Sequence, residues 1–465
     1  GLAALNVSED WPQDVRIVSP GDDSEDFPPS WSNVDEAITW CVEKAQDIPF
    51  GVLAPETLVW KLAALIQNSA AGGANRTFTA EQLPDLLEQL VVQLQDFPSP
   101  PEIYRPQRNE PDLVSEDRVR LITGFSGAGK TAWASQAAVH CPAPIAYIDI
   151  GDMPAASVAP DIARELAARF IGGRAERFGG AVFADKTGLN VLRATDRMLT
   201  EQGLSVQVIL DNVNHVDAAT IRTLIDAAPG LRFLCLAQPW PGAGVLEAQF
   251  GIEAGRLHGW TEDDVAAEFA AAGAALDVAT ARRVLHLTGG LPLYVQNAAR
   301  LSSTEYGSNA TAFCDAIAQR TNDRETAQEI ILRAAFDALN EDSRLLATVL
   351  SMSDVTLTRE EVAFIVGDVV PTSARVATAL RSLRRSSMTI VYQGDRIALH
   401  DALRPLALDD KDSLPTGTVE AVLDRLTETM MVSLSRERDI PRFSFMLRLL
   451  PRVGRTEALV ALAAY

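Results

Sequence analysis

One eight-residue stretch, GFSGAGKT at residues 124–131, constrains the fold of this chain more than any other feature. It matches the pattern G-x-x-x-x-G-K-[S/T] at every fixed position. The apolar run at 119–122 before it is typical of a strand, and residues 131–138 after it are typical of a helix. Because backbone N–H groups of such a turn point inward, at the positive end of a helix, they bind phosphate. The stretch therefore predicts a phosphate-binding loop for a nucleoside triphosphate.

Each position of the predicted loop has a chemical role. Its three glycines allow the backbone to curve around a phosphate without clashes from Cβ atoms. Lys130 is expected to neutralise the β- and γ-phosphates, and the Thr131 hydroxyl is expected to bind Mg²⁺. The expected cofactors are thus ATP or ADP with Mg²⁺. The predicted nucleotide-binding residues of the loop are Gly124, Ser126, Gly127, Ala128, Gly129, Lys130, Thr131 and Ala132.

Around the loop, residues 114–258 alternate between apolar strand-like runs and helical patterns. Alternation of this kind indicates a parallel sheet covered by helices, with the ligand at its carboxyl edge. One helix is expected at 156–171, where apolar residues recur at spacings of three and four. The strands are expected near 119–123, 145–150, 205–211 and 232–237.

The strand ending at Asp211 carries the second chemical signal. A carboxylate at the end of a buried strand beside a phosphate loop is a ligand for Mg²⁺, so Asp211 and Thr131 are the predicted metal residues. The next residue, Asn212, takes the position where many hydrolases of this class carry a second acid that orients water. We therefore predict Lys130, Asp211 and Asn212 as catalytic residues, and expect a slow ATPase.

Two further polar residues follow the predicted strands. Asp217 is either a substitute for the second acid or the N-cap of a helix at 218–228, and the second role is the expected one. Gln238 follows the strand at 233–237 and is a candidate sensor of the γ-phosphate.

The rest of the chain is predicted to be mostly helical. Residues 1–113 contain helix-like segments near 33–47, 55–69 and 79–95 and a proline-rich linker at 97–101. Residues 259–325 form a small helical domain, whose first helix starts with a cap at Thr261. Residues 326–410 contain helices near 328–352, 358–367 and 372–386 and a hairpin of strands at 389–392 and 396–399, which together predict a winged helix. Residues 411–465 are helical and are interpreted as the start of a repeat array.

Two short motifs in these regions are ambiguous when taken alone. The sequence GGLPL at 289–293 is an ordinary way to end one helix and start another, and a lone histidine, as in LHD at 399–401, is more often structural than functional. In order, however, the phosphate loop, LDN at 210–212, GGLPL, the winged helix and LHD resemble the STAND class of signal-transducing P-loop ATPases. This class includes the NB-ARC and NACHT proteins of immunity, and bacterial antiphage-defence proteins share its plan. The resemblance covers roughly residues 117–410.

The resemblance implies a fold and a function. It implies that Pro292 packs against adenine, that His400 contacts the β-phosphate of ADP, and that residues 259–325 act as a helical lid. Nucleotide domain, lid and winged helix close over ADP; ATP opens them, and the protomers assemble into a homo-oligomer. A protein or other pathogen-derived trigger is expected to act through a C-terminal sensor, and an N-terminal effector, of which residues 1–113 are the end, is expected in a longer chain. The chain departs from the family at Leu399, where the family has Met, and at Asn212.

Composition limits the alternatives. The formal net charge of −21 argues against a surface built for nonspecific binding to nucleic acid. A P-loop ATPase whose winged helix binds DNA, as in transcription or origin regulators, remains the alternative, because one predicted helix carries four arginines. These are Arg375, Arg381, Arg384 and Arg385. A metabolic kinase or transport ATPase would need an acceptor pocket or transporter signature, which the sequence lacks.

Compartment and redox chemistry follow from two simpler features. No apolar run reaches the roughly 18 to 20 residues that cross a bilayer, so we expect a cytoplasmic protein without membrane contact. The four cysteines are far apart and form no C-x-x-C motif, which favours buried apolar residues over zinc ligands or disulfides. They are Cys41, Cys141, Cys235 and Cys314.

Overall fold

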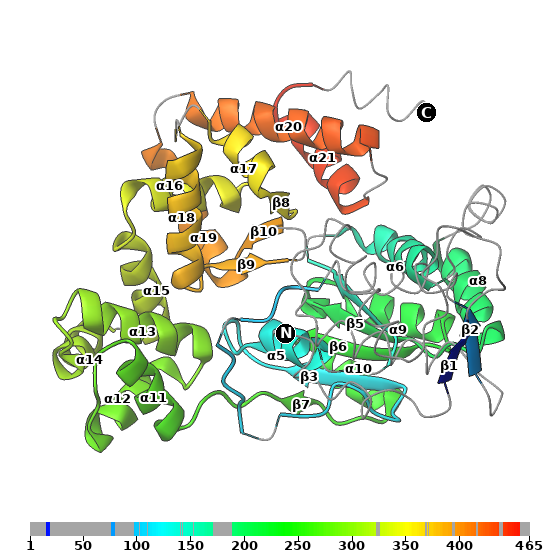
Figure 1. The fold of residues 1–465 in the computed structure, drawn as a ribbon, viewed down its shortest axis with the longest axis horizontal. Helices are drawn as coiled ribbons and strands as arrows, with labels where there is room; N and C mark the ends of the chain where they lie inside the picture. Colours follow the sequence, from blue (N-terminus) through cyan, green and yellow to red (C-terminus); the bar gives the residue numbers. More distant parts are fainter. Residues whose placement is uncertain are drawn as a thin grey trace. The chain divides into compact units, whose positions relative to one another are not determined.

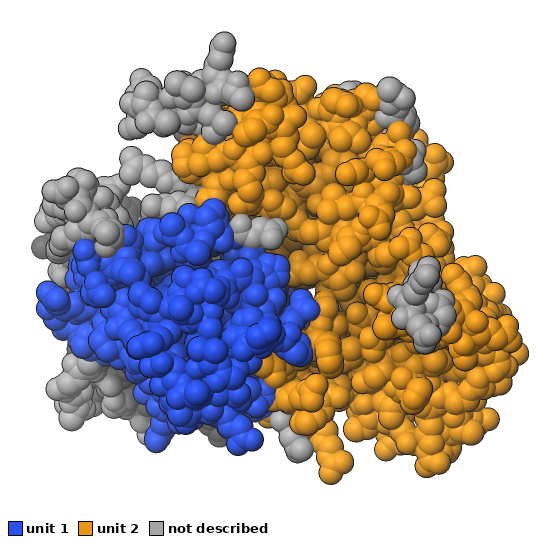
Figure 2. Space-filling view, turned by 180° about the vertical axis from the view of Figure 1, so that it is seen from behind, with its two compact units in different colours: residues 1–101, 111–122, 131–255 blue, residues 102–110, 123–130, 256–465 orange. Residues whose placement is uncertain are grey.

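The described residues fall into two units, each of which has its own core. The structure, a computed structural model, describes residues 97–455 except 102, 109, 140, 142, 152, 171–187, 322–325, 368–369, 371, 393–395, 415–416 and 437–439, and before them only the backbone of 15–18 and 76–79. Figure 2 colours the two units. Unit 1 comprises 1–101, 111–122 and 131–255, and unit 2 comprises 102–110, 123–130 and 256–465.

A five-stranded sheet carries the strand that leads into the predicted loop (Figure 1). Its strand order is β4 (Ile145–Asp149), β5 (Gln207–Asp211), β6 (Arg232–Ala237), β3 (Val119–Thr123) and β7 (Gly255–Arg256). β5 is parallel to both β4 and β6, and Asp149 lies opposite Asp211 in the register. The four predicted strands are confirmed. β7 was not predicted, because two residues are too few to show an alternating pattern.

Helices and strands of unit 1 enclose one hydrophobic core. Its buried residues include Ile148 of β4, Leu210 of β5 and Phe233 of β6, which pack with apolar side chains from the helices. The helix predicted at 156–171 is confirmed with its start shifted by one residue. The helices are α5 (Lys130–Val139), α6 (Ala155–Phe170), α8 (Gly188–Glu201), α9 (Ala218–Ala227) and α10 (Gly242–Phe250).

Unit 2 begins its helical part at a predicted cap. Thr261 accepts the Asp264 N–H, and the Asp264 carboxylate accepts the Thr261 N–H, so the cap at the start of α11 (Glu262–Ala271) is confirmed. Three more helices follow before residue 321: α12 (Val278–Thr288), α13 (Pro292–Thr304) and α14 (Ala310–Arg320). The next two are α15 (Ala327–Asp337) and α16 (Glu341–Ser351). The prediction of one helical stretch at 328–352 is therefore wrong. Asn340 is extended and its side chain accepts the Ser343 N–H, which ends one helix and caps the next.

A small antiparallel sheet accompanies the later helices. The strand order is β8 (Leu357–Thr358), β10 (Arg396–Leu399) and β9 (Thr389–Val391), so the predicted hairpin strands are present and β8 is an addition. The helices of this part are α17 (Arg359–Ile365), α18 (Ser373–Arg385), α19 (Arg404–Asp409), α20 (Thr418–Arg436) and α21 (Ile440–Arg452).

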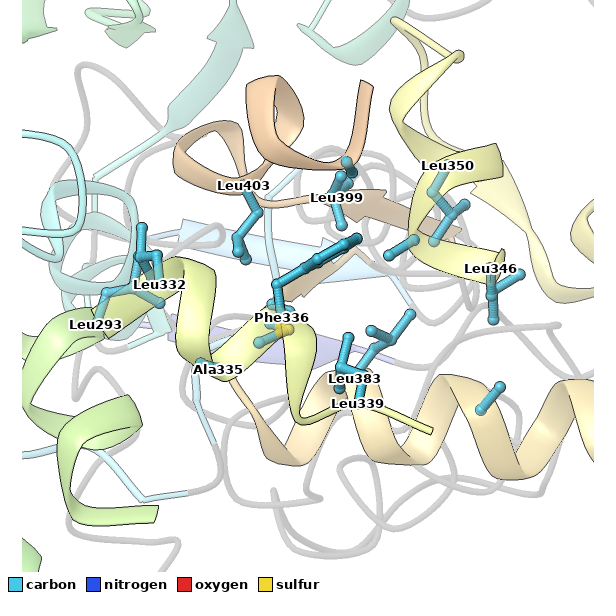
Figure 3. Packing of buried hydrophobic residues seen from close by; sticks show 14 of the residues in the cluster. Leu293, Leu332, Ala335, Phe336, Leu339, Leu346, Leu350, Leu383, Leu399 and Leu403 are labelled. Atoms are coloured by element: carbon cyan, nitrogen blue, oxygen red, sulfur yellow. The ribbon is translucent and has the colours of Figure 1, made fainter. Parts of the chain in front are cut away.

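The core of unit 2 is continuous from the first helices to α21. Figure 3 shows Phe336 of α15 surrounded by Leu339, Leu399 and Leu403. Ala128 of the predicted loop belongs to this core. Residues of the loop therefore pack into the core of unit 2 through apolar contacts.

Two short strands lie in the N-terminal region. β1 (Val15–Val18) and β2 (Arg76–Thr79) pair in parallel. Neither strand was predicted, because each has only four residues and its partner is far away in sequence. The helices predicted near 33–47, 55–69 and 79–95 fall outside the described residues, apart from Thr79, which belongs to β2.

The environment of the cysteines and the length of the apolar helices can be compared with the predictions. Cys141, Cys235 and Cys314 are buried, as predicted, and Cys41 lies outside the described residues. Among the helices that the structure describes, none combines the length and the apolar character needed to cross a membrane.

Candidate nucleotide-binding site

The predicted loop connects β3 to α5 through backbone conformations that require glycine. Gly127 and Gly129 have φ angles of +79° and +83°, in the left-handed region. A Cβ on Gly127 would lie 2.9 Å from the Cβ of Leu293. The Ala128 N–H donates to the Phe125 carbonyl at 3.0 Å and closes the turn. Ser126 and Ala132 are partly buried, the first inside the loop and the second in the first turn of α5.

The GGLPL segment contacts this loop directly. Gly289 ends α12 with a φ of +65°, and Pro292 is the first residue of α13. The Leu293 N–H donates to the Gly127 carbonyl at 3.2 Å. A Cβ on Gly129 would lie 3.7 Å from Pro292 Cγ, so the proline ring borders the loop. The segment thus ends and starts helices, as its residues predict, and also touches the phosphate loop.

Gln107 supports the loop from a segment that carries no motif. Its buried side chain donates from Nε2 to the Ala128 carbonyl at 2.6 Å and accepts the Gly259 N–H at 2.7 Å. Nearby, Trp260 Nε1 donates to the Arg105 carbonyl at 3.2 Å. Sequence analysis missed Gln107, because a lone amide in an irregular segment has no spacing that could reveal its role.

Lys130 and His400 interact electrostatically within unit 2. Lys130 is buried, and its Nζ donates to the carbonyls of Gly124 at 2.7 Å and Phe125 at 3.3 Å. His400 directly follows β10, and its Nδ1 accepts the Ala402 N–H at 3.1 Å. Burial lowers the pKa of His400; the positive charge of Lys130 lowers it too, and Asp401 opposes both. A neutral imidazole that accepts at Nδ1 carries its proton on Nε2, where it can donate to an anion.

The predicted metal residues meet in unit 1. Thr131 Oγ1 donates to Asp211 Oδ2 at 2.7 Å, and the hydroxyl of Tyr147 donates to the same oxygen at 2.8 Å. Asp211 Oδ1 accepts the N–H of Asn212 at 2.8 Å. One hydroxyl and one carboxylate, completed by phosphate oxygens and water, suit Mg²⁺, which keeps several waters and takes few protein ligands. Tyr147 was missed, because a tyrosine inside an apolar strand reads as a core residue.

Asn212 is bound to an acid on the neighbouring strand. It adopts the left-handed conformation, with φ +58°, and its Nδ2 donates to Asp149 Oδ1 at 2.8 Å. The same oxygen accepts the Gly151 N–H at 3.0 Å. Asp149 was not predicted, although its position at the end of a strand beside the one that ends in Asp211 was a usable signal.

Two other candidates have local contacts. The side chain of Asp217 accepts the Thr220 N–H at 2.9 Å and caps α9, so the capping prediction is confirmed. Hydrogen bonds from the Thr220 side chain and backbone lower the pKa of Asp217. Gln238 follows β6, is partly buried, and donates its backbone N–H to Asn214 Oδ1 at 2.8 Å. Nothing in these contacts links either residue to a phosphate.

Comparison with solved structures supports the fold. No family model and no curated protein matches the chain. A STAND (signal transduction ATPase with numerous domains) protein with a tetratricopeptide-repeat sensor from Pyrococcus horikoshii is similar in structure, with a TM-score of 0.56 and 17% sequence identity. The match covers 79% of this chain and 51% of that protein, so the chain spans about half its length.

Other solved structures are more distant. A Walker-type ATPase of Pyrococcus abyssi matches with a TM-score of 0.28 and 13% identity over 63% of this chain and 91% of that chain. The ORC2 protein of Aeropyrum pernix, in ADPNP–ADP complexes, matches with a TM-score of 0.30 and 12% identity over 68% of this chain and 89% of that chain. The parallel sheet, the loop between β3 and α5, and the similarity to the Pyrococcus horikoshii protein together establish the fold of a P-loop NTPase.

Proposed function

We propose that this chain is an ATP- and ADP-dependent molecular switch of the STAND type. In the ADP state, Lys130, Pro292 and His400 bind one nucleotide. This shared nucleotide holds two parts against the phosphate loop: the lid, residues 259–325, and the winged helix, within residues 326–410. ATP and a trigger release this arrangement, and the opened chains form a homo-oligomer. The oligomer activates an N-terminal effector, as in antiphage defence.

One observation carries the proposal: the loop contacts the GGLPL segment, and the charge of Lys130 lowers the pKa of His400. The Leu293 N–H binds the Gly127 carbonyl, and the charge of Lys130 acts on the imidazole of His400. A metabolic P-loop enzyme has no need for either feature. In a switch they are useful, because the same diphosphate then binds to three segments that are far apart in sequence.

Known magnitudes make such a switch plausible. A charge-assisted hydrogen bond to a phosphate stabilises the closed form by about 1.5–3 kcal/mol. A trigger that binds the open form better by ~5.5 kcal/mol inverts a 1:99 population. A few phosphate contacts are therefore enough to hold the protein inactive, and one binding event is enough to release it.

The finer architecture fits the same proposal. α16, α17 and α18 with the β8–β10–β9 sheet form the winged helix, and α20 and α21 begin a helical sensor. The similar Pyrococcus horikoshii protein has a tetratricopeptide-repeat sensor, which supports a sensor of helical repeats here.

The test is ADP retention and mass in solution. We expect the purified protein to hold ADP as a monomer and to assemble when ATP and its trigger are supplied. His400→Ala should weaken ADP binding about 10-fold or more, which corresponds to one lost charge-assisted hydrogen bond. The matched control is His286→Ala, since His286 is an exposed histidine of α12 in the same unit. Equal ADP affinity in both variants, or a monomer in the presence of ATP and trigger, would contradict the proposal.

The alternative is a P-loop ATPase whose winged helix binds DNA. The observation that favours it is that Arg381, Arg384 and Arg385 are exposed on α18, the third helix of that domain. The fourth arginine, Arg375, is engaged by the carboxylate of Asp342. Replacing Arg384 and Arg385 by alanine and measuring DNA binding against salt tests this alternative. Binding that depends on these residues and weakens steeply with salt would favour it over the switch.

A further inference from the structure

Asp149, at the end of the strand next to β5, is a candidate for the acid that position 212 lacks. β4 and β5 are parallel and paired, and Asp149 lies opposite Asp211 in their register. Both carboxylates thus end their strands at the same edge of the sheet. Asp211 is engaged by Thr131 and Tyr147, whereas Asp149 is exposed and binds the Asn212 side chain.

Hydrolysis of ATP needs a group that orients the attacking water and accepts its proton. An amide such as that of Asn212 can orient a water by hydrogen bonding, but it cannot act as a base at neutral pH. A carboxylate can do both. The carboxylate of Asp149 accepts a hydrogen bond from the Asn212 side chain at 2.8 Å.

We propose that Asp149 is the general base of ATP hydrolysis and that Asn212 orients the water beside it. This inference rests on the proposed function. The water oxygen attacks the γ-phosphorus, and the bond from that phosphorus to the β–γ bridging oxygen breaks. ADP leaves with the bond's electron pair, Asp149 takes the proton of the water, and inorganic phosphate is released. The carboxylate of this pair thus ends β4, and its amide directly follows β5, at the position where other hydrolases carry the acid.

The backbone at Asn212 is left-handed, which favours a specific role for this residue. Residues other than glycine rarely adopt the left-handed conformation, and asparagine tolerates it better than most. The hydrogen bond to Asp149 fixes the amide in this conformation. A hydrogen bond between Asp149 and Asn212 that only stabilises the fold would look the same. The experiment therefore has to separate a structural role of Asp149 from its role as a base.

Asp149→Asn separates them, because the amide oxygen can still accept from Asn212 and from the Gly151 N–H. Loss of the base should lower single-turnover phosphate release about 100-fold or more, while the affinity for ADP stays within about threefold. The matched control is Asp217→Asn, in which an exposed acid of the same unit is replaced by a residue that caps α9 equally well. Its turnover should be unchanged. Wild-type turnover in Asp149→Asn would overturn the inference.

The double variant Asp149→Asn with Asn212→Asp exchanges the two side chains. It tests whether one carboxylate at either position is enough for hydrolysis. We expect it to recover at least tenfold over Asp149→Asn alone, and a variant that stays as slow as Asp149→Asn would overturn this equivalence. Nucleotide binding keeps the two proposals distinguishable. A wild-type protein that binds neither ATP nor ADP contradicts the proposed switch, whereas one that binds both without turnover contradicts only the role of Asp149.

Discussion

At the scale of single residues, Tyr147 is the least expected part of the site. Its phenol and the Thr131 hydroxyl both donate to Oδ2 of Asp211, and its ring packs on Phe97, with ring centroids 5.2 Å apart. A carboxylate bound by two donors has little freedom to rotate. Tyr147 therefore positions the oxygen atoms that would bind Mg²⁺.

Tyr147→Phe removes this hydrogen bond and keeps the ring. Because a hydrogen bond to a charged group contributes about 1.5–3 kcal/mol, we expect Mg²⁺-dependent ATP binding to weaken about tenfold. Binding of ADP in EDTA should not change. Nucleotide titrations with and without Mg²⁺ measure both, and Tyr306→Phe, whose ring packs edge-on against Phe313, is the control. An equal loss with and without Mg²⁺ would mean that Tyr147 acts on folding instead.

The same residues indicate what sequence can and cannot reveal at this scale. The loop residues were predicted because their chemistry depends on spacing within eight consecutive positions. Asp149, Tyr147 and Gln107 act through partners that are 63, 64 and 21 positions away. No local pattern encodes such contacts. Predicting them would require the register of β4 against β5 and the path of the irregular segment that contains Gln107.

At the scale of elements, one buried ion pair attaches α21 to α17. Arg442 is buried and binds Glu361 at 2.9 Å through Nη2, and it also donates to the Thr356 carbonyl at 3.0 Å and to Ser433 at 2.8 Å. Burial alone raises the pKa of Glu361. Hydrogen bonds from Arg442 and the Thr358 backbone, together with the charge of Arg442, outweigh burial and lower it.

Arg442→Met should detach α21 from α17, because it leaves the Glu361 carboxylate partly buried without its partner. Breaking a buried pair costs about 3–5 kcal/mol, and the low end applies to this partly exposed acid. Hydrogen exchange of residues 440–452 should accelerate accordingly, while Arg455→Met, which breaks an exposed pair with Asp424, should change little. Since the folded pKa of Glu361 is lowered, the attachment is stable above the ordinary pKa of 4.5 and weakens as the pH falls through the folded value. Unchanged exchange in Arg442→Met would refute this account.

Elements were predictable where their ends are encoded locally. The caps at Asp217 and Thr261 were predicted because a capping side chain and its N–H partner are three residues apart. The break at Asn340 carried the same type of signal, but continuous apolar spacing across it led to a prediction of one helix. Short strands such as β7 and β8 exist only through their partners, so periodicity cannot detect them.

At the scale of the whole molecule, the described residues form two hydrophobic cores with no residue in common. Phe233 is fully buried in the core of unit 1, and Phe313 is fully buried in that of unit 2. A chain with two cores is not expected to unfold in a single two-state step. Each core should instead govern the stability of its own unit.

This expectation can be tested with one large-to-small substitution in each core. Phe233→Ala and Phe313→Ala each remove a buried ring, which costs about 3–5 kcal/mol. In calorimetry we expect each variant to lower a different transition, and hydrogen exchange should accelerate in β5 and β6 for the first and in α13 and α14 for the second. Phe364→Ala, at a side chain that is 47% exposed, is the control and should lower neither transition appreciably. If both core variants lowered one shared transition equally, the two units would unfold as a single cooperative structure and this account would be wrong.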